Sequence, residues 1–146
     1  MTYVLVSVCG TLYCVDVTRV HGVVEVDAVT QVPGAPGQIR GVMNVGGRVL
    51  PLGDLAIALG GAPTTNGART TAFLLDTNRR DGPAFAMLGD VVDVVELSED
   101  RIEPPPSFGL GAAASLVTGI AHLAAGDLAL VLDPERLLES MGVTAK

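Results

Sequence analysis

The chain has 146 residues, of which 49 % are apolar, 3 % are aromatic and none is tryptophan. The length fits one compact unit, and an aliphatic core rich in valine favours strands over helices. A net charge of −7 and a pI near 4.6 repel phosphate backbones and anionic lipid surfaces, so we expect no nucleic-acid partner. The apolar runs are too short to span a membrane, and no leader pattern is present. We therefore expect a cytoplasmic protein without direct membrane insertion.

The first forty residues predict short strands. Residues 4–8 and 12–15 form a hairpin around Gly10-Thr11, and Asp16 caps a helical turn over residues 17–20. Another strand follows over residues 22–26. Cys9 and Cys14 flank the first turn, where a two-residue turn would put Cys9 opposite Leu12 and not opposite Cys14. We expect both thiols to be reduced and buried as small apolar groups.

A second hairpin is predicted in the centre of the chain. Residues 32–37 contain two prolines and two glycines and must form a loop. Residues 39–45 and 48–52 are strand-like and are joined by Gly46-Gly47, a typical hairpin turn. Asp54 then caps a short helix over residues 55–59.

The second half continues in the same pattern. Strands are predicted over residues 70–76, 83–88, 91–97, 116–123 and 128–132, with a hairpin tip in residues 77–82 and an extended crossing over residues 103–106. Asp133 and Pro134 begin a terminal helix that places Leu137, Leu138 and Met141 on one face. Roughly nine or ten short strands at this spacing indicate an all-β sandwich or barrel with a few short helices. We take residues 1–146 as a single domain.

No pattern predicts a catalytic, cofactor or metal site. His21 and His122 lack the spacing of metal ligands, and the acidic residues near strand ends have capping roles or lie in turns. An acid–base pair formed only in space remains open as an alternative. A small-molecule or flavin site is a second alternative, but scarce aromatic and basic residues disfavour it.

Three stretches, in the same order along the chain, resemble the CheW-type domain. The first reads Val32-Pro33 … Pro36 … Ile39-Arg40-Gly41-Val42-Met43-Asn44 … Gly47-Arg48-Val49-Leu50-Pro51-Leu52 … Asp54-Leu55. The second is residues 84–94. The third comprises Thr118-Gly119-Ile120-Ala121, Leu130-Val131-Leu132-Asp133 and Leu137-Leu138.

This resemblance implies two packed, SH3-like five-stranded β-barrels, intertwined as two lobes of one domain. It also implies a non-catalytic adaptor that couples chemoreceptors to a histidine kinase in a bacterial chemosensory complex. The implied partners are the regulatory domain of the kinase and the signalling tip of a methyl-accepting chemoreceptor. The implied location is cytoplasmic, at receptor arrays on the inner membrane. An apolar groove between the lobes suits a helical receptor tip.

By position, the family's protein-binding residues fall on Val20, Val23, Gly41, Asn44, Val45 and Gly46. At Gly41 the backbone is expected to pass another segment closely, and Asn44 is expected to bond the turn. Two departures stand out, because the family usually has Arg at the position of Gly46 and often Glu at the position of Gly22. The alternative function is therefore a divergent member that binds only one partner and modulates or caps the array.

Overall fold

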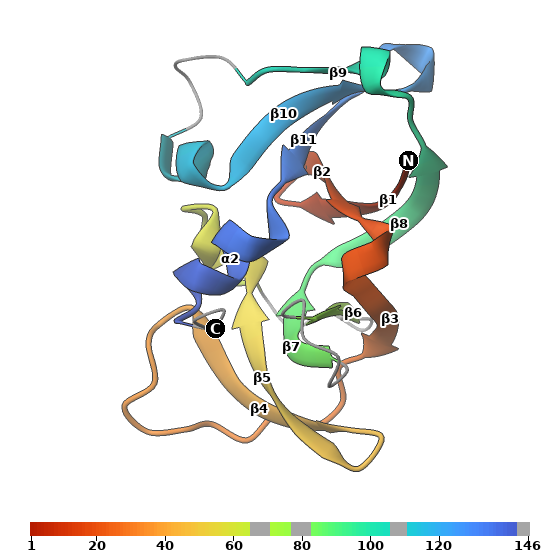
Figure 1. Ribbon diagram of the computed structural model, residues 1–146. Coiled ribbons are helices and arrows are strands. Elements are labelled where there is room, and N and C mark those ends of the chain that lie inside the picture. The colour runs from red at the N-terminus through yellow and green to blue at the C-terminus, as the bar shows by residue number, and fades with distance from the viewer. Residues whose placement is uncertain (65–70, 77–82, 106–110, 143–146) are drawn as a thin grey trace.

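The structure is a computed structural model that describes residues 1–64, 71–76, 83–105 and 111–142. It consists of two curled β-sheets, one above the other in Figure 1. Sheet A has the strand order β8 (Asp90–Glu96), β1 (Thr2–Val8), β2 (Thr11–Asp16), β11 (Leu128–Leu132), β10 (Val117–His122) and β9 (Ile102–Glu103). Sheet B has the order β3 (Val20–Glu25), β6 (Thr71–Asp76), β7 (Pro83–Leu88), β5 (Arg48–Asp54) and β4 (Ile39–Val45).

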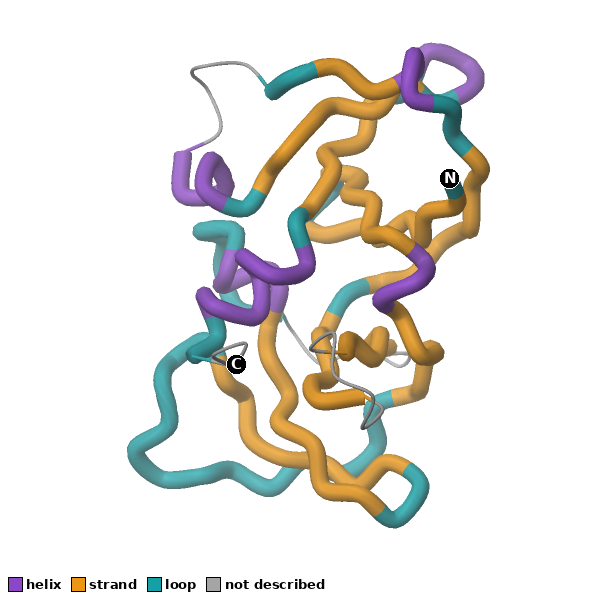
Figure 2. The backbone as a smooth tube through the Cα atoms, in the orientation of Figure 1, coloured by secondary structure: helices purple, strands orange, loops and turns teal. Residues whose placement is uncertain are grey.

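The chain crosses twice between the sheets. It begins in sheet A, builds all of sheet B from β3 to β7, and returns to sheet A with β8. Each sheet also contains one parallel pair, β2 with β11 and β5 with β7, that joins segments far apart in sequence. Figure 2 shows the two helices α1 (Leu55–Ala58) and α2 (Pro134–Ser140) in the region between the two sheets. The strands of sheet A therefore come from both the first and the last part of the chain.

The predicted all-β fold of two packed five-stranded barrels with short helices is confirmed, except that one of the two sheets has six strands. Sheet A contains a sixth strand because β9 pairs with β10 in the segment predicted to be an extended crossing. This strand has two residues and lies at the outer edge of the sheet, where the prolines that follow it cost no ladder hydrogen bond. The predicted hairpin tip at residues 77–82 lies outside the described residues.

The turn between β1 and β2 differs from the prediction. Val8 pairs with Thr11, so the two turn residues are Cys9 and Gly10, with φ of 51° and 80°. Two positive φ angles give the turn the twist that antiparallel strands prefer. Cys9 is exposed at this turn, so the prediction that it is buried is wrong, whereas Cys14 is buried as predicted. Both cysteines are free.

The aspartate caps are confirmed. Asp133 Oδ1 accepts a hydrogen bond from the Glu135 amide at 2.9 Å at the start of α2. Asp16 Oδ1 accepts one from the Thr18 amide at 3.0 Å, at the short 3-10 helix η1 (Val17–Arg19). These contacts satisfy amides of the first helical turn that have no partner within the helix.

The apolar core has three parts, and the largest lies between the sheets. Side chains alternate along β1, so Val4 and Val6 join the central cluster while Tyr3 and Leu5 point into sheet A. A third cluster fills the inside of sheet B. The central cluster contains Val4, Val6, Val8, Tyr13, Val15, Leu55, Ala56, Phe73, Leu75, Phe85, Met87, Leu116, Val117, Leu132, Leu137, Leu138 and Met141. Strands such as β1 and β6 are thus buried on both faces.

Candidate functional site

The β4–β5 hairpin holds three of the predicted binding residues at its tip. Gly46 and Gly47 have φ of 57° and 90°, the geometry of a tight two-residue turn. Asn44 Oδ1 accepts a hydrogen bond from the Gly47 amide at 2.9 Å, as predicted. Val45 packs partly against the core of sheet B, whereas Val49, which pairs with Asn44, is 68 % exposed. The hairpin tip thus presents Val49, a residue that no motif of the sequence marks as a binding residue.

Gly41 lies where β4 meets the segment around Thr30. The Thr30 amide donates to the Val42 carbonyl at 2.9 Å, and the Val42 amide donates to the Thr30 carbonyl at 2.9 Å. A Cβ atom at Gly41 would lie 2.2 Å from the Thr30 carbonyl oxygen, and φ there is 148°. The expected close approach of backbone is confirmed, and it fixes the loop between β3 and β4.

Replacing Gly41 with alanine is expected to destabilise the protein by about 2–3 kcal/mol, because the new methyl group must push two backbones apart. Urea unfolding followed by circular dichroism measures the change. Gly37→Ala is the matched control, because a Cβ atom there meets nothing within 4 Å, and we expect a change below about 0.5 kcal/mol. Equal stabilities of the two variants would show that the approach at Gly41 is not tight.

The six predicted residues lie on two strands of sheet B and the turn that follows one of them. Val20 and Val23 lie on β3, whereas the other four lie on β4 and its turn, and β3 and β4 are at opposite ends of the strand order of sheet B. Val20 packs partly against the central cluster, and Val23 is 47 % exposed. Val23 and the hairpin tip are therefore two candidate surfaces.

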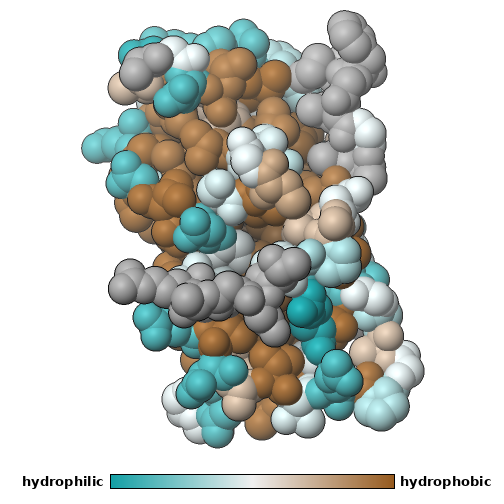
Figure 3. Space-filling view, turned by 180° about the vertical axis from the view of Figure 1, so that it is seen from behind, coloured by the Kyte–Doolittle hydropathy of each residue, from teal (hydrophilic) through white to brown (hydrophobic). Residues whose placement is uncertain are grey.

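Two further exposed valines lie on β8. Val92 and Val94 are 50 % and 55 % exposed, and Figure 3 shows apolar side chains over much of the rear face of the sheet A lobe. β6 pairs with β3 and also contacts β8, so it connects the strand of Val23 with the strand of the other two valines. We call Val23, Val92 and Val94 the outer valines. The sequence predicts a strand over these residues but does not indicate which of its valines are exposed.

A buried carboxylate organises the end of β5. Asp54 is fully buried, and its Oδ1 caps α1 by accepting from the Ala56 amide at 3.1 Å. Its Oδ2 accepts from the Thr64 amide at 2.8 Å and from Arg40 Nη1 at 3.1 Å. Thr64 Oγ1 also donates to Asp54 Oδ1 at 2.6 Å. The sequence predicted the cap, but the pairing with Arg40 and Thr64 required the folded chain.

A second polar cluster links three elements where the lobes meet. Arg19, at the end of η1, donates through Nε to Asp76 Oδ1 at 2.8 Å and lies 2.7 Å from Glu135 Oε1 of α2. His21 Nε2 lies 2.8 Å from Asp76 Oδ2. Burial disfavours the charge of Arg19, but hydrogen bonds and attraction from the two carboxylates outweigh it and raise the pKa of its guanidinium. This cluster holds η1, β6 and α2 together.

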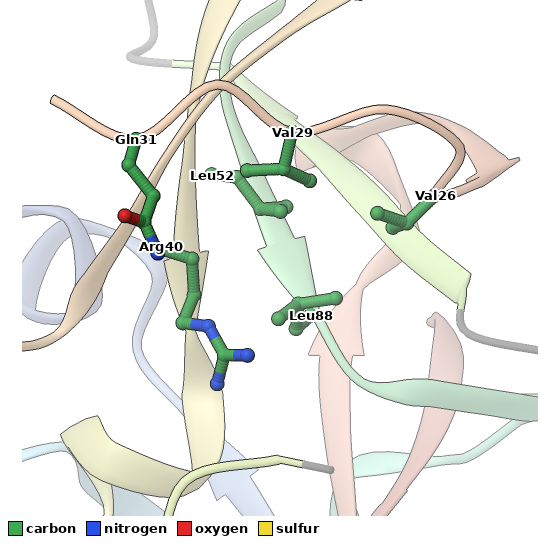
Figure 4. A pocket seen from close by; sticks show the side chains of 6 residues that line it. All are labelled: Val26, Val29, Gln31, Arg40, Leu52 and Leu88. Atoms are coloured by element: carbon green, nitrogen blue, oxygen red, sulfur yellow. The ribbon is translucent and has the colours of Figure 1, made fainter. Parts of the chain in front are cut away.

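A small cavity opens at one end of sheet B (Figure 4). It has a volume of about 160 Å³ and is lined by Val26, Val29, Gln31, Arg40, Leu52 and Leu88. Arg40 Nη1 is already bonded to Asp54 and to the Thr64 carbonyl oxygen. Among the described residues of this lining, Arg40 is the one cation, and a buried carboxylate neutralises it. These residues therefore offer no unpaired positive charge to an anionic ligand.

Within the described residues, no three His, Cys, Asp or Glu side chains are grouped so that they could hold a metal ion. Burial raises the pKa of the Cys14 thiol to about 12, so this sulfur stays protonated at neutral pH. Among the described helices, none has the length and apolarity needed to cross a bilayer.

Two small curled sheets around a shared core define a β-class fold, and its exposed valines on β3, β5 and β8 are candidate contacts for a partner protein. A family model described as the CheW-like domain matches residues 2–141, and the chain therefore belongs to the CheW-like family.

Curated relatives and a solved structure agree with this assignment. The chain is 30 % identical to "Chemotaxis protein CheW" of Klebsiella aerogenes over 128 residues, which cover 88 % of this chain and 75 % of the relative. It is 24 % identical to the protein of the same description from Treponema pallidum, over 88 % of this chain and 76 % of that one.

The crystal structure of the scaffolding protein TtCheW from Thermoanaerobacter tengcongensis superposes with a TM-score of 0.82 at 25 % identity. The match covers 99 % of this chain and 94 % of that one. The predicted class of protein, a non-catalytic chemotaxis coupling adaptor, is confirmed by this family membership.

Proposed function

We propose that this chain couples the signalling tip of a methyl-accepting chemoreceptor to the regulatory domain of a histidine kinase. The complex would be located in the cytoplasm, at receptor arrays on the inner membrane. Family membership supports the coupling role in general. A coupling protein must contact two partners. The single observation that favours both partners is that the chain exposes apolar side chains at two places, at the outer valines and at the hairpin tip with Val49.

The receptor tip is assigned to the outer valines. They lie on β3 and β8, strands of different sheets that share β6 as a neighbour. A helical hairpin that carries a row of apolar side chains can pack on such a surface without a strand-like backbone. The hairpin tip, with Asn44, Val45, Gly46 and Val49, is assigned to the kinase domain.

Calorimetric titrations against a soluble receptor-tip fragment and against the kinase regulatory domain test the two contacts separately. We expect dissociation constants in the micromolar range for both. Val23→Ser should weaken receptor binding alone, and Val49→Ser should weaken kinase binding alone, so each variant is the control for the other. The absence of binding to both partners would reject the proposal.

The second candidate function is that of a divergent family member that binds only one of the two partners. It is favoured by the glycines at positions 22 and 46, where the resemblance leads us to expect charged side chains. A Cβ atom at either glycine meets nothing within 4 Å, so space for a larger side chain exists. Both glycines have positive φ, 154° and 57°, so a substitution costs about 1–2 kcal/mol of backbone strain.

Gly46→Arg tests this alternative. If the missing charge restricts binding, the variant should bind one of the two partners several-fold more tightly than the parent chain, since an exposed ion pair contributes up to about 1 kcal/mol. Gly46→Gln carries the same backbone strain without the charge and serves as the control. Unchanged affinity for both partners would show that the lost arginine does not limit binding.

A further inference from the structure

The cavity at the end of sheet B is apolar on one side and polar on the other. The apolar side consists of four aliphatic side chains, Val26, Val29, Leu52 and Leu88. Gln31 and Arg40 form the polar side, and they lie to the left of the aliphatic group in Figure 4. Leu52 and Leu88 are 0 % and 3 % exposed, whereas Gln31 is exposed, so the cavity has an apolar floor and a polar mouth. Pockets that bind small organic molecules commonly have this composition.

Backbone contacts hold the wall of this cavity in place. Val26 and Val29 belong to the loop between β3 and β4, and the paired hydrogen bonds between Thr30 and Val42 attach this loop to β4. The glycine at position 41 permits this approach, because a Cβ atom there would collide with the Thr30 carbonyl group. Since the wall is already fixed before a ligand arrives, binding carries little cost for ordering the chain.

A second, open hollow leads to the cavity from outside. It has a volume of about 430 Å³ and is lined by residues 31–33, 35–37, 39 and 40, which belong to the proline-containing loop and the start of β4. The two hollows share Gln31 and Arg40. Both of these side chains are long and at least partly exposed, so a small molecule can pass them to reach the apolar floor.

The charges beside the cavity favour a neutral ligand. Arg40 Nη1 donates to the Asp54 carboxylate and to the Thr64 carbonyl oxygen. A carboxylate in the cavity would approach the fully buried Asp54 carboxylate, and like charges repel strongly where little water screens them. A cation would be repelled by Arg40, and none of the described lining residues is acidic. A neutral molecule meets neither penalty.

Arg40 retains hydrogen-bond donors that a ligand can use. A guanidinium group carries five N–H donors and no acceptor. Asp54 and Thr64 accept from Nη1, whereas no hydrogen bond among the described residues uses Nε or Nη2. A ligand oxygen can therefore accept from Arg40 without displacing Asp54, and a hydrogen bond from a charged donor is a strong one. A carbonyl oxygen suits this site, because it needs only a donor.

We propose that the cavity binds a small neutral carbonyl compound, such as a cyclic ketone or a lactone. The volume of about 160 Å³ limits the ligand to about six to eight non-hydrogen atoms, since an apolar cavity of about 150 Å³ accommodates benzene. The aliphatic side chains contact the ring of the ligand, and Arg40 donates to its carbonyl oxygen. The described lining includes neither the outer valines nor the hairpin tip, so the inference goes beyond the coupling function and does not depend on it.

Methyl-detected NMR of the full chain tests the proposal with three ring compounds of similar size. Cyclohexanone is the neutral carbonyl compound, cyclohexanecarboxylate is the anion, and cyclohexylamine is the cation at neutral pH. We expect cyclohexanone to shift the methyl signals of the four aliphatic side chains in a saturable way, with a dissociation constant of about 1–5 mM for so small a ligand. Each charged compound should bind at least about tenfold more weakly, because its charge would be buried without a partner.

Three results of this titration would overturn the proposal. The first is the absence of a saturable shift up to about 20 mM cyclohexanone. The second is that the largest shifts occur in methyl groups outside the cavity. The third is equal or tighter binding of either charged compound. Saturable shifts at the cavity would support the proposal even if the receptor and kinase fragments do not bind.

A variant that fills the cavity locates the site. Val26→Phe places a ring in the space and should weaken cyclohexanone binding at least about tenfold. Leu128→Phe is the matched control, because it introduces the same side chain at an exposed position of β11 and should change affinity by less than about twofold. Unchanged affinity in a folded Val26→Phe variant, as judged by circular dichroism, would overturn the proposal. If this variant does not fold, the methyl shifts of the parent chain decide the question by themselves.

A second substitution tests the contact with the carbonyl oxygen. Arg40→Lys keeps a cation beside Asp54 but removes the donors on Nε and Nη2. Cyclohexanone should bind this variant about three- to tenfold more weakly than the parent chain. The same affinity in both chains would show that Arg40 does not hold the carbonyl group and would overturn that part of the proposal.

Discussion

Replacing Phe73 with alanine is expected to lower the free energy of unfolding by about 3–5 kcal/mol and to weaken both sheets together. Phe73 is fully buried on β6, in the cluster that also contains Val4 of β1 and Leu137 of α2. The cavity left by the ring would remove contacts from elements of both lobes at once. We propose on this basis that residues 1–146 form a single domain whose lobes are not stable apart.

Urea unfolding of Phe73→Ala, followed by circular dichroism, measures the loss. Amide hydrogen exchange then reports β2 in sheet A and β6 in sheet B separately, and we expect protection in both strands to fall by a similar free energy. Val49→Ala is the control, because this side chain is 68 % exposed and should change stability by less than about 0.5 kcal/mol. Loss of protection in sheet B alone would contradict the single-domain proposal.

Replacing Asp54 with alanine is expected to cost a similar amount, about 3–5 kcal/mol, for a different reason. The substitution removes an acceptor for the Ala56 and Thr64 amides, and it leaves Arg40 without its carboxylate. A buried N–H group that loses its acceptor keeps its full desolvation penalty without a hydrogen bond to offset it. The loop that follows α1 should loosen, because Thr64 attaches it to Asp54 through both its amide and its hydroxyl.

Urea unfolding also measures the stability of Asp54→Ala. Two control variants separate the contribution of the carboxylate charge from that of the helix cap. Asp54→Asn keeps one acceptor oxygen but no charge, so it should lie between the parent and the alanine variant. Asp16 caps η1 in a similar way, but it is partly exposed and its hydrogen bonds stay within its own turn. Asp16→Ala should therefore lower the free energy of unfolding by only about 0.5–2 kcal/mol. If Asp54→Ala lowers the free energy of unfolding no more than Asp16→Ala does, the contribution of Asp54 comes from the helix cap alone and not from its contacts with Arg40 and Thr64.

Local features of this protein could be predicted from neighbouring residues alone. The Asp133 cap, the Gly46-Gly47 turn and the bond from Asn44 to that turn depend on atoms a few residues apart, so their geometry follows from residue type and spacing. The predicted first turn was wrong by one residue, at Gly10-Thr11 instead of Cys9-Gly10, although either dipeptide offers a glycine. Cys9 adopts a positive φ because strand register, fixed by burial along β1 and β2, decided which residues turn.

Residue types and their spacing were enough to predict the all-β class, most strands along the chain, and the two hairpins around β1–β2 and β4–β5. The resemblance to the CheW-like family came from three sequence segments that match the family's motifs. Folding was needed to show which strands share a sheet, that the largest core lies between the sheets, and that Arg40 and Arg19 meet Asp54 and Asp76. Folding also placed Val23 and the hairpin tip on different strands of sheet B and left Val92 and Val94 exposed. The difference is one of range, because caps and turns are set by local geometry, whereas pairing, burial and charge contacts are set by residues that come together from distant parts of the chain.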